Sequence, residues 1–169
     1  LDVCAASTPI LNGANAGNYA ELVELAKRND VVLGVKGANL DELYDTTAAI
    51  EAAGYKNLVL DVTGENVKDT FANAVQVRRA ALKDKDRTFG YPSIVDISKL
   101  APNNEVKQTA LASIFTLKYG SIIVMDGMSY AQALPLYGLS QNIYTDPQKP
   151  MKVEPGIYRL NGADENSIC

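Results

Sequence analysis

The chain has 169 residues, of which 47% are hydrophobic and 21% are charged, an ordinary composition for one globular domain. Its formal net charge of −4 argues against nucleic-acid binding, which requires a clustered basic surface. No apolar run approaches the roughly 20 residues of a membrane-spanning helix, and no basic-then-apolar segment opens the sequence. We therefore expect neither a membrane span nor a secretory leader.

The sequence contains no histidine and only two cysteines, Cys4 and Cys169. Without histidine there is no Ser–His or Cys–His nucleophile pair, no imidazole base and no His-ligated metal. Two cysteines at opposite ends of the chain are too few for a zinc or iron–sulfur site built within it. We therefore expect a cytoplasmic protein in which chemistry would rest on carboxylates, Lys, Tyr or a borrowed cofactor.

Strand and helix patterns alternate in chain order. Residues 9–11 form a short predicted strand, and the spacing of Asn18 and Glu21 predicts the capped start of a helix. Residues 31–35 form a buried predicted strand, and Asn39 with Glu42 repeats the capping spacing. Gly54 is expected in a left-handed conformation at the end of this second helix.

The next two units follow the same pattern. A strand over residues 58–60 finishes in Asp61, and a strand over residues 93–95 finishes in Asp96. The helix after the first of these strands is the longest, and the helix after the second begins at Pro102 and ends at Gly120. Their predicted apolar faces are Val67, Phe71, Ala74, Val75 and Leu82, and then Val106, Ala110, Ile114 and Leu117.

The last unit begins with an apolar run over residues 122–125, read as a buried strand of a parallel sheet, and closes in Asp126. Ser129 and Gln132 have capping-box spacing, and Pro135 is expected to kink or end the short helix that follows. Residues 142–150 then form a turn-rich exit.

Five strand–helix steps predict an α/β fold with a parallel sheet and right-handed connections. An open doubly wound sheet is the alternative, but Gly34 and Gly37 do not complete a GxGxxG phosphate motif. The prediction is a parallel (β/α) TIM-barrel type, incomplete in this chain, with about five βα units and an exit strap. Residues 1–144 would be the C-terminal part of the barrel, with about three strands upstream of Leu1, and residues 145–169 the exit segment.

Three aspartates, Asp61, Asp96 and Asp126, follow successive strands and are the barrel-top candidates, because strand ends converge on one face of a barrel. They could hold a metal, orient a ligand or contact a partner, but each is more simply explained as satisfying amides at the start of the next helix. No catalytic or metal-binding residue is predicted. Arg78 could bind an anion, although laying its methylenes over the core edge is the favoured role.

Two stretches carry a resemblance to a known family: residues 59–95, VLDVTGENVKDTFANAVQVRRAALKDKDRTFGYPSIV, and residues 141–158, QNIYTDPQKPMKVEPGIY. They resemble the large (gamma) subunit of the corrinoid iron–sulfur protein. That protein belongs to the carbon monoxide dehydrogenase/acetyl-CoA synthase (acetyl-CoA decarbonylase/synthase) system of acetogens and methanogens. The resemblance extends from about residue 18 to residue 166.

The resemblance implies a methyl carrier of the reductive acetyl-CoA pathway. In the family, corrinoid cobalt accepts a methyl group from a methylated folate or pterin through a methyltransferase and passes it to acetyl-CoA synthase. The full assembly contains cobalamin and an iron–sulfur cluster, none bound by this chain alone. The implied partners are the small subunit, which forms a heterodimer with the large one, the methyltransferase, and carbon monoxide dehydrogenase/acetyl-CoA synthase.

Under this reading the chain is a scaffold and docking barrel that does not catalyse alone. Residues 145–169 would lead toward a cobalamin-binding domain not present in the chain, and Tyr144, Thr145 and Asp146 would face the corrinoid or the partner. The rival reading is a carboxylate-dependent βα-barrel enzyme, a lyase, aldolase or pterin-binding methyltransferase. It would use the strand-end aspartates, and Lys36 is the one strand-end lysine available to an aldolase.

Overall fold

The computed structural model describes residues 4 and 7–142. Within them lies a five-stranded sheet in which all four strand pairs are parallel and the spatial order is the chain order. The strands are β1 (Ile10–Ala14), β2 (Val32–Lys36), β3 (Leu58–Asp61), β4 (Ser93–Asp96) and β5 (Ile122–Val124).

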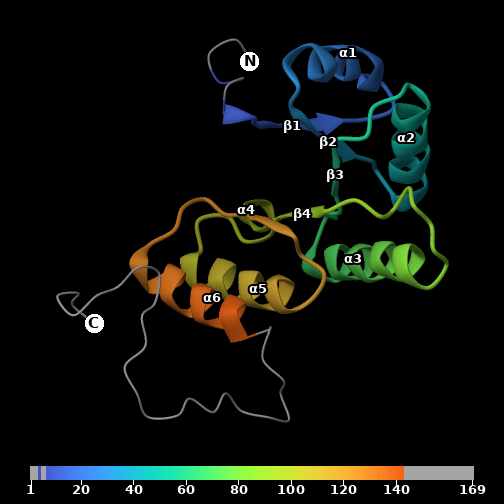
Figure 1. Cartoon of the computed structure of the whole chain (residues 1–169). Helices are drawn as coiled ribbons and strands as arrows, with labels where there is room; N and C mark the ends of the chain where they lie inside the picture. Colours follow the sequence, from blue (N-terminus) through green and yellow to red (C-terminus); the bar gives the residue numbers. More distant parts are fainter. Residues whose placement is uncertain (1–3, 5–6, 143–169) are drawn as a thin grey trace, which may run out of the picture.

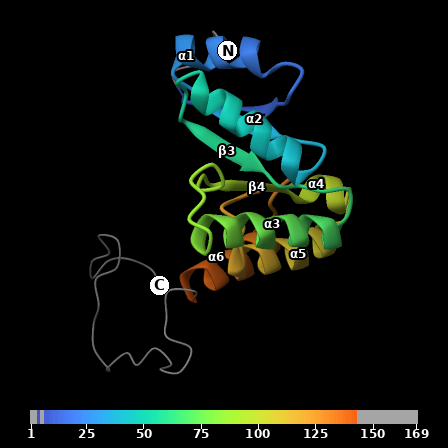
Figure 2. The ribbon, with the colours of Figure 1, turned by 90° about the vertical axis from the view of Figure 1, so that its right-hand side faces the viewer.

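Helices connect these strands and continue beyond the last one. They are α1 (Tyr19–Asn29), α2 (Leu40–Ala52), α3 (Val67–Leu82), α4 (Ile97–Leu100), α5 (Glu105–Leu117) and α6 (Tyr130–Asn142). Figure 1 shows α1, α2, α3 and α5 following one another around one side of the sheet. Figure 2, turned toward that side, shows α1 and α2 above α3, α5 and α6 below α3, and the short α4 beside β4.

This arrangement follows from strand order. Each right-handed crossover moves one strand further in the same direction, so each connecting helix lies on the same face of the sheet. A doubly wound sheet would reverse direction at a switch point, and the strand order β1-β2-β3-β4-β5 contains no reversal. The predicted α/β class and parallel sheet are confirmed, and the architecture is consistent with a βα-barrel-like fold.

The core lies between the sheet and its helices. The strand register places Leu33 beside Leu58 and Val35 beside Leu60, so these four side chains point to one face. All four are buried in a single hydrophobic cluster with helical residues, which include Val23, Ala26, Leu43, Ile50, Ala74, Val77, Leu111, Ala112 and Phe115. Because successive side chains of a strand point to opposite faces of the sheet, the residues between these four point away from the helices.

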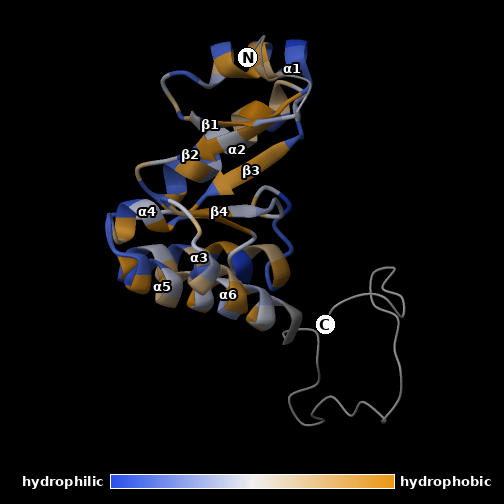
Figure 3. Cartoon of the chain, turned by 90° about the vertical axis from the view of Figure 1, so that its left-hand side faces the viewer, coloured by the Kyte–Doolittle hydropathy of each residue, from blue (hydrophilic) through white to orange (hydrophobic). Residues whose placement is uncertain are grey.

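Those alternate residues form the inner face of the sheet. Gly34 pairs with Val59, and Asp61 pairs with Ile94, on the face opposite the helical core. Val59 and Ile94 are buried, yet they lie outside the hydrophobic cluster formed with the helices. Figure 3 views the molecule from the side opposite to Figure 2, with β2 and β3 mostly in the hydrophobic colour.

Side-chain amides and carboxylates cap most of the helices. At α2 the Asn39 side chain accepts from the Glu42 amide at 2.9 Å, and Glu42 accepts from the Ala38 amide at 3.1 Å, which confirms the predicted cap. Gly54 follows this helix with φ +83, as predicted. The predicted cap of α1 is wrong, because the Asn18 side chain accepts from the Asn15 amide and makes no bond within the helix.

The predicted apolar face of α5 is wrong, and that of α3 is confirmed only in part, at Ala74 and Val67. In α3 the buried residues are Thr70, Ala74 and Val77, whereas Phe71 and Leu82 are 37% and 62% exposed. In α5 the buried residues are Gln108, Leu111, Ala112 and Phe115, and the predicted stripe is exposed. In both helices a polar side chain, Thr70 or Gln108, is buried because it has hydrogen-bond partners, and the helix is rotated accordingly.

The last unit also differs from its prediction. The strand β5 is at the sheet edge with Val124 39% exposed, so it is not the buried strand that its apolar run suggested. Pro135 does not end α6, which continues to Asn142 and packs along α5. At its start, the Gln132 side chain accepts from the Ser129 amide at 2.8 Å, half of the predicted capping box.

Candidate functional site

The carboxyl ends of the strands carry a polar network around Asp61, the last residue of β3. Its side chain is fully buried, and its Oδ1 accepts a hydrogen bond from the Thr63 amide at 3.0 Å. Its Oδ2 accepts from Asn12 Nδ2 at 3.3 Å and lies 3.7 Å from the Lys36 ammonium nitrogen. Burying a carboxylate without partners costs free energy, and these three contacts offset that cost for Asp61.

Gly34 makes one of these contacts possible. Asn12 is in β1 and Asp61 is in β3, so the amide side chain must cross the intervening strand β2 at Gly34, its register partner. A Cβ atom at Gly34 would lie 2.3 Å from Asn12 Oδ1, which is impossible without displacement of the amide. The glycine is therefore needed for close approach across the strand.

Asp96 extends the network at the end of β4. The Thr63 hydroxyl accepts a hydrogen bond from the Asp96 amide at 2.8 Å, which joins the ends of β3 and β4. The Asp96 carboxylate accepts from the Ser98 hydroxyl and from the Lys99 amide, and it lies 2.9 Å from the Lys99 ammonium nitrogen. Asp96 thus caps α4, in agreement with the simpler explanation of this aspartate.

The charges of this network are balanced. Burial by itself would raise the pKa of Asp96, but the bonds from Ser98 and Lys99 outweigh burial and lower it. The Asp96 contact in turn raises the pKa of Lys99, with a smaller contribution from the Asp61 charge. With two carboxylates and two ammonium groups already paired, the network is suited to holding strand ends in place or orienting a polar ligand.

Asp126 does not join the other two aspartates. Its Oδ2 accepts from Gln108 Nε2 at 2.6 Å and from the Asn103 amide at 3.1 Å, and its own amide donates to Gln108 Oε1. Gln108 is 2% exposed and also donates to the Ala101 carbonyl. Asp126 therefore ties the segment after β5 to the start of α5. Among residues 4 and 7–142, no group of three or more carboxylate, thiol or imidazole side chains could hold a metal ion.

Other predicted site residues are placed as follows. Lys36 ends β2 and pairs with Asp61 in the polar network described above. Arg78 lies on α3 and is exposed. Tyr144, Thr145 and Asp146 lie outside the described residues, so their proposed role stays a prediction.

Residue spacing does not predict the uncharged members of the network, Asn12 and Thr63. Asn12 precedes Gly13 at the end of a short apolar run, and Thr63 precedes Gly64 before a helix, so both match ordinary turn positions. Their roles depend on β1, β3 and β4 being neighbours, which residue spacing alone does not reveal. Gln108 could have been noticed as a polar residue at a spacing of three and four from buried Leu111 and Ala112.

Comparison with known proteins adds an independent finding. The family model described as "CO dehydrogenase/acetyl-CoA synthase delta subunit" matches residues 1–168. The chain belongs to this family.

Similar proteins include the corrinoid/iron-sulfur protein large subunit of Moorella thermoacetica, 38% identical over 94% of the chain and 35% of that protein. The acetyl-CoA decarbonylase/synthase complex subunit gamma of Archaeoglobus fulgidus is 33% identical over 95% of the chain and 36% of that protein. The gamma subunit of Methanothermobacter thermautotrophicus is 30% identical over 99% of the chain and 39% of that protein. These relatives confirm the predicted resemblance to the large, or gamma, subunit.

The chain spans little more than a third of the length of these relatives. The family model bears the delta-subunit name, whereas the relatives are large or gamma subunits. Among the described residues, no helix is both long and apolar enough to cross a membrane.

The network makes a prediction about Gly34. Gly34→Ala should lower the free energy of unfolding by about 1–3 kcal/mol, because the new methyl group displaces Asn12 from Asp61. Urea unfolding followed by circular dichroism measures this change. Gly138→Ala in α6 is the matched control, since a Cβ there meets no atom within 4 Å. Equal losses in both variants would contradict the proposed crossing of β2.

A second prediction concerns Asp96. Asp96→Ala should lower the free energy of unfolding by about 1 kcal/mol at neutral pH, because the α4 cap is lost. The pKa of Asp96 is lowered in the folded state, so its contribution is present above the ordinary value of 3.8 and is lost as pH falls further.

Urea unfolding at several pH values should therefore give a wild-type advantage that is constant above about pH 5 and shrinks below about pH 4. Asp96→Asn, which keeps a capping oxygen, should lose less stability at neutral pH. An advantage of wild type over Asp96→Ala that grows on acidification would contradict the assignment.

Proposed function

We propose that this chain is the barrel-domain portion of the large subunit of a corrinoid iron–sulfur protein. The parent protein would carry a methyl group from a methylated folate or pterin to acetyl-CoA synthase. This part would serve as a scaffold that positions a corrinoid-bearing domain and docks the small subunit, and it would not catalyse alone. The observation that carries the proposal is similarity over 94–99% of the chain to large or gamma subunits of this system.

The proposed scaffold is a closed βα barrel. An eight-stranded barrel needs about three strands beyond the five described, and they would close the sheet between β5 and β1. The exposure of two apolar side chains supports closure of the sheet: Ile10 on edge strand β1 and Val124 on edge strand β5 are each 39% exposed. Closure would cover both side chains and leave the strand-end network at the mouth of the barrel.

Residues 1–144 would then be the C-terminal part of the barrel, and residues 145–169 would lead toward a cobalamin-binding domain. Tyr144, Thr145 and Asp146 would contact the corrinoid or the small subunit from this exit. The whole protein would be located in the cytoplasm of an anaerobic organism.

The residues of this chain do not fit an iron–sulfur cluster, since such a cluster uses four thiolates and the sequence has two cysteines. They could offer a corrinoid only polar and packing contacts, because the chain has no imidazole to ligate cobalt. Cobalamin would supply the methyl-carrying cobalt, and the role of these residues would be to orient the domain that holds it.

An exposed apolar stripe on α5 is our proposed docking surface for the small subunit. Ile114 and Leu117 are 44% and 51% exposed, and Val106 is 82% exposed, with Ala110 between them. Residues at this spacing share one side of a helix, and a continuous apolar side open to water favours a protein partner. The stripe is the face that the sequence pattern assigned to the core.

The rival function, a carboxylate-dependent barrel enzyme, is less well supported by the geometry. Asp126 is bound to Gln108 and Asn103 and is not part of the network around Asp61 and Asp96. The Lys36 ammonium nitrogen lies 3.7 Å from Asp61 Oδ2, so Lys36 is engaged with this buried carboxylate, whereas an aldolase lysine must be free to attack a carbonyl.

The test is purification of the protein as its gene encodes it, together with its candidate partners, under anaerobic conditions. We expect an unlike subunit and a red-brown corrinoid chromophore to co-purify, and we expect methyl transfer from a methylated folate or pterin only in that assembly. A divalent metal bound at the aspartates, or methyl transfer to cobalamin by the isolated chain, would contradict the proposal.

The docking surface has its own prediction. Ile114→Glu should weaken binding of the small subunit by about tenfold or more, because a charge would be buried at the centre of an apolar contact. Leu82→Glu is the matched control, since Leu82 is 62% exposed on α3 and lies outside the stripe. Analytical ultracentrifugation with the purified small subunit gives both dissociation constants. Unchanged binding by Ile114→Glu would exclude the stripe as the interface.

A further inference from the structure

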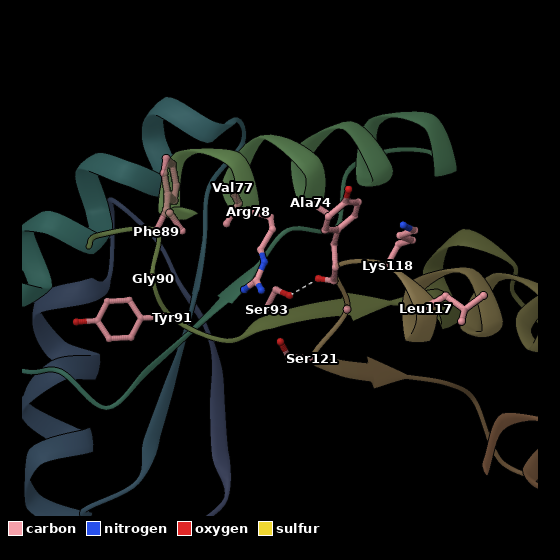
Figure 4. A pocket seen from close by; sticks show the side chains of 13 residues that line it. Ala74, Val77, Arg78, Phe89, Gly90, Tyr91, Ser93, Leu117, Lys118 and Ser121 are labelled. Carbon is pink, nitrogen blue, oxygen red and sulfur yellow. Dashed lines mark hydrogen bonds between the residues drawn. The ribbon is translucent and has the colours of Figure 1, made fainter. Parts of the chain in front are cut away.

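A cavity of about 440 Å³ lies at the end of the sheet opposite the strand-end aspartates. It opens beside the first residue of β4, between α3, the segment that precedes β4 and the turn that joins α5 to β5. Figure 4 shows this cavity from close by. Its lining consists of Ala74, Val77, Arg78, Ala81, Phe89, Gly90, Tyr91, Ser93, Leu117, Lys118, Tyr119, Gly120 and Ser121.

The charges in this lining are all positive. Arg78 and Lys118 contribute to it and no carboxylate does, although the chain as a whole has a net charge of −4. Such a local excess of positive charge favours a negatively charged occupant.

Arg78 is the central group. Its side chain extends from α3 toward Ser93, across the cavity. No hydrogen bond or ion pair joins the guanidinium to any other residue in the described part of the chain, so its five N–H donors are available. Arg79, one residue later, is absent from the lining and is also exposed.

The rest of the lining limits what can be bound. The Ser93 hydroxyl donates to the Tyr119 carbonyl at 2.8 Å, and the Gly90 and Gly120 amides donate to backbone carbonyls, so these donors are already used. The helices α3 and α5 end nearby with partial negative charge, which disfavours an anion held by backbone alone. Binding must therefore depend on the guanidinium and on the apolar wall of Val77, Ala81 and Phe89.

We propose that this cavity binds a small molecule that carries an oxyanion, a phosphate or a carboxylate, on a short apolar or aromatic group. The guanidinium fork of Arg78 matches two oxygens of such a group, and the apolar wall covers the remainder of the ligand. The volume of the cavity lies in the range of small-molecule sites, and Arg78 is exposed, so a ligand can reach it from solvent. The proposal does not depend on the scaffold role proposed above, although Leu117 belongs both to this lining and to the apolar stripe on α5.

Isothermal titration calorimetry with phenyl phosphate tests the proposal on the protein as its gene encodes it. Arg78→Gln should weaken binding roughly ten- to a hundredfold, the usual effect of losing a charge-assisted hydrogen bond. Arg79→Gln removes the same charge from the neighbouring position and should change binding less than about twofold. Thermal unfolding of both variants verifies that they are folded.

Two further probes separate the parts of the ligand. Inorganic phosphate should compete with phenyl phosphate but bind more weakly, and benzoate should bind through its carboxylate. Arg78→Lys, which keeps the charge without the fork, should give intermediate affinity and replaces Arg78→Gln if that variant does not fold. The proposal is overturned if phenyl phosphate does not bind at millimolar concentration, or if Arg78→Gln and Arg79→Gln weaken it equally.

Discussion

The constraint on which this structure depends is that its strand order is its chain order. With right-handed crossovers, that order places the connecting helices on one face of the sheet and leaves the other face to the strands alone. The helical face contains the hydrophobic cluster, whereas the inner face contains Val59, Ile94 and a buried carboxylate. The fold therefore separates a packing face from a face that can carry polar groups.

Asp61 shows what the inner face requires. A fully buried carboxylate loses its hydration, and one ammonium group at 3.7 Å does not offset that loss by itself. Asn12 and the Thr63 amide provide the remaining bonds, and Asn12 reaches Asp61 only because β2 has a glycine at that point. The register of three strands is thus linked to one side chain, which makes a one-residue slip of β1 or β2 costly.

The sequence predicted the elements better than their faces. Alternating strand and helix patterns gave the five units in order, and Asn39 with Glu42 predicted a real cap, because both signals depend on neighbouring residues. The apolar spacing of Val106, Ile114 and Leu117 did not predict burial, because Gln108 on the other side binds Asp126 from a distant segment. Aspartates at strand ends were found from spacing, but only the three-dimensional arrangement separates Asp126 from Asp61 and Asp96.

Hydrogen exchange is the most direct measurement of the central claim, that the inner face and the edge strands belong to a larger closed barrel. In the protein as its gene encodes it, the amides of β5 that point away from β4 should exchange as slowly as those of the central strand β3, because a further strand pairs with them. Exchange of these β5 amides at the rate of an exposed loop would show a free edge and contradict the account.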